Sequence, residues 1–157
     1  MINDMFRTSL VAASGLRAGR VWMNVLSNNI SNMNTVDTGI KDASGNYIPY
    51  AREVPVFAKV LSEKFRENKV NKDVLNGVKV DQIALLKESV KKVYDPTNPA
   101  ARLPGTADAG YVYYPGVNLA QEMADLKIAS ASYEANLTVI GVDSKMMQGA
   151  LAIGRSS

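Results

Sequence analysis

Residues 119–153 read "LAQEMADLKIASASYEANLTVIGVDSKMMQGALAI", and the spacing of their apolar side chains decides the fold. Alternating steps of four and three residues connect Leu119, Met123, Leu126, Ser130, Tyr133, Leu137, Ile140, Ser144, Met147 and Leu151. This spacing is typical of a long helix with a coiled-coil-like seam. Asn118 is a suitable N-cap, and Gln121 three residues later completes a capping-box-like start. With Gly154 as its end, the predicted helix is about 52 Å long at 1.5 Å per residue.

The N-terminal end of the chain repeats this pattern. The same spacing connects Ile2, Met5, Ser9, Ala12, Leu16, Gly19, Met23, Leu26 and Ile30. Small side chains at Ser9, Ala12 and Gly19 make this seam thin, so that a partner helix could approach closely. A second apolar row, offset from the first, consists of Phe6, Leu10, Ala13 and Val21. Two interpretations stay open: a helical hairpin with a core of its own, or a helix pair whose uncovered apolar rows pack against neighbouring subunits.

The middle of the chain changes to the period of an extended chain. Strands are predicted where apolar residues alternate with polar ones or gather in short runs, at residues 50–61, 78–86 and 111–114. The charged residues 62–77 predict a loop or hairpin tip that projects outward. Pro96, Pro99 and Pro104 exclude a regular helix or a central strand from their segment.

These patterns together predict a mainly α fold. The long N- and C-terminal helices are expected to pack as a coiled-coil-like pair, the inner domain, around a small β-rich and partly extended middle insertion. The corresponding division of the chain is 1–35, 36–116 and 117–157.

Composition excludes several functional classes. The chain has 157 residues, which suits one domain, and it has neither cysteine nor histidine. Thiol chemistry is therefore excluded, as are the commonest general base and the commonest transition-metal ligand. The net charge of +3 is spread along the chain, so nucleic-acid binding has little support. We expect no metal, no cofactor and no small-molecule substrate, and the sequence shows neither a cleaved apolar leader nor a membrane span.

One short motif suggests catalysis. "VDTGI", residues 36–40, contains the Asp-Thr-Gly of aspartic proteases, and a homodimer would supply two copies of Asp37. "VIG", residues 139–141, imitates the segment that packs below such a site, but it lies inside the predicted C-terminal helix. A three-residue motif also occurs often by chance, so a dimeric aspartic protease is the alternative from a different class and not the preferred interpretation.

Four longer motifs carry a resemblance to a known family. "SGLRAGRVWMNVLSNNISNMNT", residues 14–35, resembles the N-terminal signature of the axial proteins of the bacterial flagellum, the rod and hook family. "SYEANLTVIGVDSKMMQGALAIG", residues 132–154, resembles the matching C-terminal signature. "VYDPTNPAA", residues 93–101, and "GYVYYPGVNLAQEMADL", residues 110–126, resemble the proximal-rod members of that family. Ser31 and Met33 depart from the alanines that are usual there.

The resemblance implies a structural protein without catalytic activity. Family members polymerise through their terminal helices into a tube that transmits torque and forms the wall of the export channel. The expected partners are copies of this chain, other proximal and distal rod proteins and the flagellar type III export apparatus. The expected location is the basal-body rod in the periplasm, reached without a cleaved signal peptide. Another rod or hook subunit with the same terminal signatures is the alternative within the family.

The residues expected to form the assembly interface share two properties: they lie on the helical seams or in the asparagine-rich end of the first helix. They are Leu16, Met23, Leu26, Asn28, Asn29, Ile30, Asn32, Asn34, Leu119, Met123, Leu126, Tyr133, Asn136, Leu137, Ile140, Met147 and Leu151. For the asparagines, a turn that stops the helix is the alternative to a contact with a neighbouring subunit. Asp95, Pro96 and Pro99 form either a rigid surface turn or a fixed connector between the helices and the middle domain.

Overall fold

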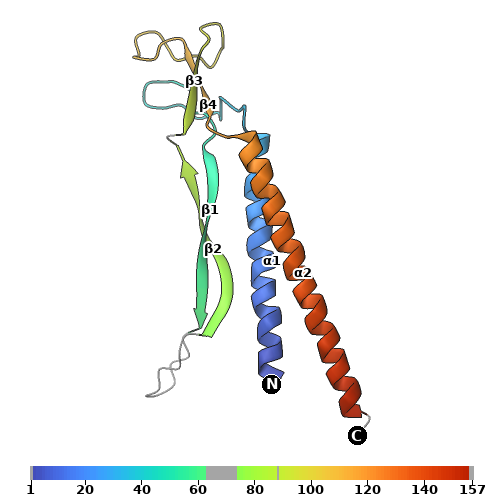
Figure 1. Cartoon of the computed structure of the whole chain (residues 1–157). Helices are drawn as coiled ribbons and strands as arrows, with labels where there is room; N and C mark the ends of the chain where they lie inside the picture. Colours follow the sequence, from blue (N-terminus) through green and yellow to red (C-terminus); the bar gives the residue numbers. More distant parts are fainter. Residues whose placement is uncertain (1, 63–73, 88, 156–157) are drawn as a thin grey trace, which may run out of the picture. The chain divides into compact units, whose positions relative to one another are not determined.

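Two long helices flank four strands in the described part of the chain. This computed structural model describes residues 2–62, 74–87 and 89–155. The elements follow the order α1 (Ile2–Ser31), β1 (Arg52–Ser62), β2 (Val74–Leu86), β3 (Val90–Tyr94), β4 (Tyr111–Pro115) and α2 (Leu119–Arg155) (Figure 1). The predicted arrangement of terminal helices around a small strand-containing middle is confirmed. No described helix combines the length and apolar character that crossing a bilayer requires.

The strands form two separate two-stranded sheets. β1 pairs with β2, and the two arrows run in opposite directions in Figure 1. β3 pairs antiparallel with β4, with Val90 opposite Pro115 and Tyr94 opposite Tyr111. The three predicted strand segments correspond to β1, β2 and β4. β3 was not predicted, because its sequence VKKVY does not alternate; its pairing with β4 makes it a strand. Most of the predicted loop at 62–77 lies outside the described residues, and its last residues belong to β2.

Both helices begin or end at the amides that the sequence indicated. At the start of α2, the side-chain oxygen of Asn118 accepts hydrogen bonds from the amides of Ala120 (3.1 Å) and Gln121 (3.5 Å), as an N-cap does. At the end of α1, the backbone carbonyl of Asn28 accepts hydrogen bonds from both the amide and the side chain of Asn32, each at 3.0 Å. Local bonds from asparagine therefore satisfy the carbonyl that the ending helix leaves free.

The chain divides into two compact units, each assembled from three segments. The helix–ribbon unit comprises Met1–Met23, Pro55–Gln82 and Lys127–Ser157, and we call its β1–β2 portion the ribbon. The hairpin unit comprises Asn24–Val54 and Ile83–Leu126, and it contains the β3–β4 hairpin. These units combine parts of the sequence segments 1–35, 36–116 and 117–157.

The two units differ in what they bury. Described buried residues of the hairpin unit include large side chains, and the fully buried ones are Leu26, Glu122, Val25, Val112 and Asn29. Described buried residues of the helix–ribbon unit are small or acidic: Ala12, Ala18, Gly19, Gly77, Ala129 and Asp143. Because hydrophobic stabilisation grows with the apolar area buried, the large buried side chains of the hairpin unit contribute more than the small ones described in the helix–ribbon unit.

Candidate assembly interface

A buried asparagine organises the hairpin unit. Asn29 is 0% exposed, and its amide nitrogen donates to the backbone carbonyl of Glu53 (2.8 Å) and to the carboxylate of Glu122 (3.0 Å). Its amide oxygen accepts from the backbone amide of Glu53 (2.9 Å) and from the hydroxyl of Tyr50 (3.0 Å). The side chain thus makes four hydrogen bonds, which join the end of α1 to β1 and to the first turn of α2.

The carboxylate in this network is also part of an ion pair. Glu122 has a fully buried side chain, and its Oε1 accepts from Arg52 Nε at 2.7 Å and lies 2.6 Å from a terminal guanidinium nitrogen. Arg52 keeps 18% of its side chain exposed. A buried carboxylate is tolerated only when its charge and lone pairs are satisfied, and here Arg52 and Asn29 do both. We call Asn29, Tyr50, Arg52 and Glu122 the polar hub.

Tyr50 responds to the same surroundings. Burial raises the pKa of its hydroxyl to about 12, and the nearby carboxylates of Glu53 and Glu122 act in the same direction. The tyrosine therefore stays a neutral donor to Asn29 at every physiological pH.

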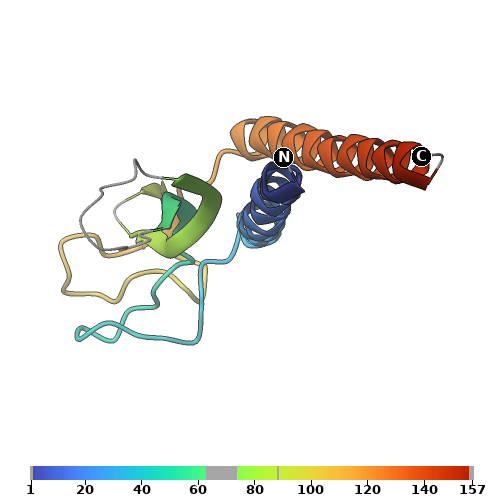
Figure 2. The same ribbon diagram turned by 90° about the horizontal axis from the view of Figure 1, so that it is seen from below.

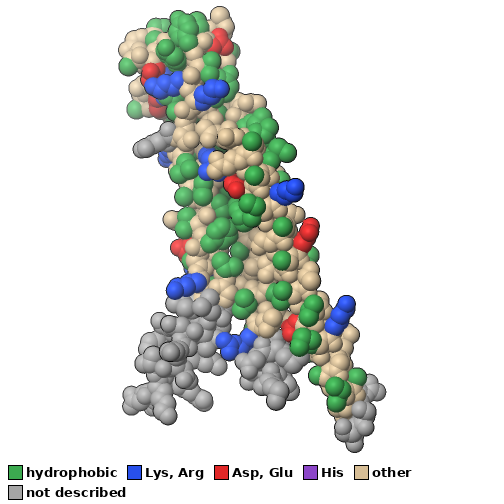
Figure 3. Space-filling view, in the orientation of Figure 1, with side chains coloured by type: hydrophobic (Ala, Val, Ile, Leu, Met, Phe, Trp, Pro, Cys, Tyr) green, Lys and Arg blue, Asp and Glu red, His purple; other side chains and the backbone are tan. Residues whose placement is uncertain are grey.

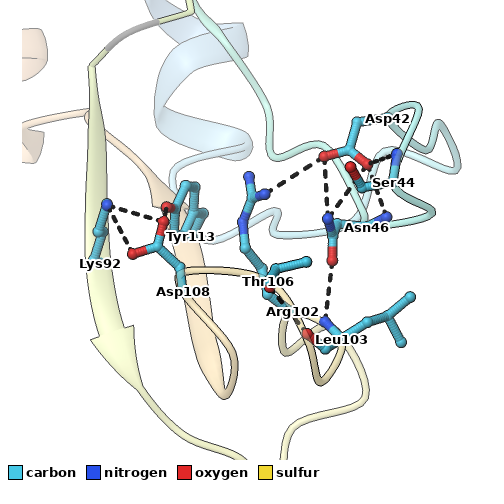
Figure 4. Close-up of polar contacts among 9 residues, drawn as sticks. All are labelled: Asp42, Ser44, Asn46, Lys92, Arg102, Leu103, Thr106, Asp108 and Tyr113. Carbon is cyan, nitrogen blue, oxygen red and sulfur yellow. Dashed lines mark hydrogen bonds and ion pairs between the residues drawn. The ribbon is translucent and has the colours of Figure 1, made fainter.

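Two loops of the hairpin unit are tied together by polar side chains (Figure 4). Asp42 accepts from the amides of Ser44 (2.8 Å) and Asn46 (3.0 Å), and the hydrogen bond from Asn46 is the main reason that the pKa of this carboxyl is lowered. The buried Asn46 in turn accepts from the backbone amide of Leu103 at 3.0 Å. Arg102 reaches back to Asp42 at 3.5 Å, so each loop holds the other.

The second loop is also fastened to the β3–β4 hairpin. The hydroxyl of Tyr113 donates to Asp108, and Lys92 donates to both oxygens of that carboxylate at 3.1 and 3.2 Å (Figure 4). The hydrogen bond from Tyr113, then that from Lys92, lowers the pKa of Asp108. The guanidinium of Arg102 lies 4.1 Å above the Tyr113 ring. A long loop without regular structure is thereby held in one conformation.

In the helix–ribbon unit, α1 and α2 pack closely and antiparallel. A side-chain carbon added to Gly15 would lie 2.8 Å from Asn136, and one added to Gly19 would lie 3.6 Å from Tyr133. Further along, the hydroxyl of Ser9 donates to Asp143. Residue numbers rise along α1 as they fall along α2, so the helices are antiparallel here. The small residues of α1 do admit a partner helix closely, and in the single chain that partner is its own α2.

The ribbon contacts another side of α1 in this unit (Figure 2). Ser14 accepts from the amide of Val78 at 3.0 Å and donates to the carbonyl of Val11 at 2.6 Å. A side-chain carbon on Gly77 would lie 1.9 Å from the Ser14 hydroxyl oxygen, so only glycine permits this approach. Nearby, the rings of Trp22 and Phe57 meet edge to face at 5.7 Å between centroids.

A row of apolar residues on α2 remains exposed in the single chain. All its members are exposed and recur at steps of three and four residues: Ile128, Ala131, Ala135, Val139, Val142, Met146, Gly149 and Ile153. The larger members expose between 40% (Val139) and 72% (Ile153) of their surface. At 3.6 residues per turn, this exposed row is rotated by about 120° from the α1 contacts at Tyr133 and Asn136. Hydrophobic side chains also recur along α2 in Figure 3.

The residues predicted for the interface fall into three groups in the single chain. Leu26 and Asn29 are buried. Half-buried residues are Leu16, Met23, Ile30, Asn32, Leu126, Tyr133, Asn136, Ile140 and Met147. Exposed residues are Asn28, Asn34, Leu119, Met123, Leu137 and Leu151. Their contacts with other subunits stay predictions, and a coiled-coil seam between α1 and α2 is not confirmed, since Leu137 and Leu151 of the predicted seam are exposed.

The predicted connector lies inside the β3–β4 hairpin. Asp95 follows β3 directly and accepts from the amide (3.2 Å) and hydroxyl (2.7 Å) of Thr97, so it begins a turn in which Pro96 and Pro99 take part. The hydrogen bonds from Thr97 lower the pKa of this carboxyl. These residues lie in a turn between two strands of one sheet, and residues 116–118 follow β4 and lead to α2. A role as a connector between the helices and the middle domain stays a prediction.

The possible protease motif has the structure of a turn. The carboxylate of Asp37 is exposed and accepts from the amide of Gly39 at 2.7 Å, and Gly39 has a φ of 76°. Val139, Ile140 and Gly141 lie within α2 and not at the end of a strand. Among the described residues, no three His, Cys, Asp or Glu side chains gather where they could hold a metal ion.

The polar hub includes residues that sequence reasoning missed. Arg52 and Tyr50 were assigned only to an alternating strand, and Glu122 was not singled out. An acidic residue in the first turn of a helix is common because of the helix dipole, so Glu122 gave no sign of burial. The sequence feature that pointed toward the polar hub is the asparagine run, because one of its members, Asn29, is buried and makes four side-chain hydrogen bonds.

Comparisons with known proteins agree with this architecture at both ends. The family described as "Flagella basal body rod protein" matches residues 10–37, and "Flagellar basal body rod FlgEFG protein C-terminal" matches residues 108–153. The two matches cover α1 from residue 10 through its asparagine-rich end, and nearly all of α2. The fold and these matches define the class: the chain is a structural protein of the flagellar rod.

Relatives similar over nearly their whole length narrow the class. The chain is 36% identical to the flagellar basal-body rod protein FlgC of Bacillus subtilis strain 168, over 96% of this chain and 98% of the relative. It is 38% identical to the protein of that name from Borreliella burgdorferi, over 95% and 97%, and 33% identical to that from Escherichia coli O157:H7, over 92% and 94%. The chain belongs to the FlgC family of flagellar basal-body rod proteins.

Proposed function

We propose that this chain is a subunit of the proximal rod that polymerises through its terminal helices, transmits torque and forms part of the wall of the export channel. It has no catalytic activity in this proposal. Its partners are copies of itself and other rod proteins. It reaches the periplasm through the flagellar type III export apparatus.

The observation that carries the proposal is the apolar surface left exposed on α2. Besides the exposed row, the predicted seam residues Met123, Leu137 and Leu151 expose 57%, 48% and 66% of their surface. A helix with apolar residues on several sides is stable when neighbours cover it. Exposed apolar surface of this extent marks an interaction site in a protein that works by assembling.

The test replaces one exposed apolar side chain by a carboxylate. Leu137→Asp changes a residue that is 48% exposed in the single chain, so the free chain should fold as before, while the assembled rod should not tolerate a buried charge. The readouts are swimming and recovery of the chain in isolated basal bodies, in a strain without its own copy. The matched control is Lys145→Asp, which puts the same carboxylate at an exposed polar position of the same helix. Normal swimming by Leu137→Asp would refute the proposal.

A further inference from the structure

The helix–ribbon unit carries an open groove on the side of α1 that its own α2 leaves free. The groove has a volume of about 350 Å³, and its larger lining residues are Leu10, Arg17, Val21, Val60, Val78, Lys79 and Val80. Leu10 and Gly19 are nine residues apart, so they lie on opposite sides of α1 at 3.6 residues per turn. The Gly19 side meets Tyr133 of α2, whereas Leu10 is 60% exposed. Each α1 therefore has one side covered by α2 and a second apolar side that is open.

We propose that the exposed row of α2 packs into this groove of a second copy of the chain. This inference rests on the proposed function and names the contact through which neighbouring copies would join. Each α1 would then lie between its own α2 and the α2 of a neighbour.

The chemistry of the two surfaces matches. The row is entirely apolar or glycine. Ala131 and Ala135 follow Ile128, the larger Val139, Val142 and Met146 come next, and Gly149 precedes Ile153. The groove offers aliphatic walls, with the small Ser14 and Ala18 and the cationic Arg17 and Lys79 also lining it. The aliphatic stems of the two cations can lie along an apolar surface while their charges stay in water. Side chains of different sizes along one helix face form ridges and gaps that can interdigitate with another apolar surface.

The size of the row favours a chain of copies over a free dimer. The row extends over residues 128–153, which is about 39 Å of helix, and a helix is about 10 Å wide. It therefore presents roughly 400 Å², about half of the ~800 Å² that each partner buries in a stable interface. A symmetric contact of row on row would remain below that size. The groove is lined on α1 by residues 10–21, about 18 Å of helix, so it receives part of the row. A copy that gives its row to one neighbour and its groove to another buries surface on both.

The direction of the contact has a consequence for assembly. Row and groove are different surfaces of one chain, so their contact is head-to-tail and leaves a free row and a free groove at the two ends of any oligomer. Such a contact propagates from copy to copy and does not close after two. This is the kind of contact that a tubular polymer requires.

The test uses cysteine pairs, because the chain has no native cysteine. Val142→Cys places a thiol in the row and Val60→Cys places one in the groove, and both replace a residue of similar size. The doubly substituted chain is expressed in a strain without its own copy, and isolated basal bodies are treated with a short thiol cross-linker. We expect products of two and more chains, in a ladder. The matched control pairs Val60→Cys with Glu134→Cys, an exposed position of α2 beside the row, and should give at most one tenth of these products.

Several results would overturn the inference. Dimers from Val142→Cys alone would show row packing on row, and cross-links to a different rod protein would assign the groove to that protein. If the doubly substituted chain is recovered in basal bodies but gives no cross-link between positions 60 and 142, this contact is refuted and the proposed function stays intact. If the unsubstituted chain is absent from basal bodies, both the contact and the proposed function are refuted. Assembly is also tested without cross-linking: Val142→Lys should reduce recovery in basal bodies at least tenfold, and Glu134→Lys should not. Normal recovery of Val142→Lys would contradict the inference.

Discussion

Replacing Arg52 by alanine removes the counter-ion of a carboxylate that water does not reach. The Glu122 side chain is 0% exposed, and among the described residues the side-chain amide of Asn29 would remain as its donor. Removing one partner of a buried ion pair typically costs 3–5 kcal/mol, because the other charge stays buried and uncompensated. Arg52 is 18% exposed, so water can partly replace it, and we expect a loss of about 3 kcal/mol. Small domains have only about 5–15 kcal/mol of stability, so the effect is large.

Removing both charges should be less harmful. In Arg52→Met with Glu122→Met, apolar side chains of similar length replace the pair, and such replacements are often neutral or stabilising. Glu122→Met also leaves one N–H of the buried Asn29 without its acceptor, which costs about 1–3 kcal/mol. We therefore expect the double variant to lose about 1–2 kcal/mol, less than Arg52→Ala. The free energy of unfolding is measured by urea titration of the purified chain, followed by circular dichroism.

An exposed ion pair provides the control for this cycle. Lys79 and Asp81 lie 2.6 Å apart with 56% and 53% of their side chains exposed, so Lys79→Ala should cost less than about 1 kcal/mol. Equal losses from Arg52→Ala and from the double variant would show no coupling between the charges. The polar hub would then not hold the hairpin unit together as described.

Three further predictions concern the ribbon, acid stability and local order. Gly77→Ala should displace the ribbon from α1, because the new carbon would lie 2.8 Å from the Ser14 side-chain carbon, and because residue 77 has a φ of 112°, which favours glycine. The fluorescence emission of the single tryptophan, Trp22, should then shift to the red. Acid should loosen the tied loops only below pH 3.8, because the pKa values of Asp42 and Asp108 are lowered from 3.8. The stabilisation that the two carboxylates give to the folded loops is present above that pH and is lost as the pH falls through the lowered pKa values. The loosening is measured by amide hydrogen exchange at residues 95–110. In the free chain at neutral pH, amides of residues 7–23 and 127–153 should exchange faster than those of residues 24–31 and 119–126, because the buried large side chains lie in the hairpin unit.

Each of these predictions has a result that contradicts it. Gly141→Ala is the control for the ribbon, because nothing lies within 4 Å of the added carbon; it should stabilise α2 by about 0.5–1 kcal/mol and leave the fluorescence unchanged. An unchanged spectrum of Gly77→Ala would disprove the close contact with Ser14. Loosening of the loops already at pH 5 would mean that the two aspartates are not held as described. Uniformly slow exchange along both helices would show that the helix–ribbon unit is stable without neighbours.

The helices and most strands could be predicted because their causes are local. The steps of four and three residues in α2, and the side chain of Asn118 at its start, act within a few residues of the chain. β3 could not be predicted, because its backbone hydrogen bonds come from β4, about twenty residues later. The loops at Asp42 and Arg102 are likewise held by residues distant in the sequence.

The surfaces of the helices were harder to assign than the helices themselves. α2 is apolar on more than one side, so spacing alone could not say which side meets α1. The predicted seam included Leu137, which is 48% exposed, whereas Ala129 beside the seam is fully buried. The asparagine run was singled out from the sequence as a helix stop or a subunit contact, and the contacts of these asparagines with other subunits stay a prediction. However, Asn29 is used entirely within the chain, by Glu53, Tyr50 and Glu122, and these partners come from elements far along the sequence.

Assembly through the terminal helices is tested most directly by an electron-microscopy reconstruction of basal bodies that contain this chain. A map that resolves the proximal rod should show α1 and α2 of each copy in the inner layer of the tube, with the apolar residues of α2 covered by helices of neighbouring subunits. A rod that lacks the chain, or a rod in which the exposed row of α2 still faces solvent, would contradict assembly through the terminal helices.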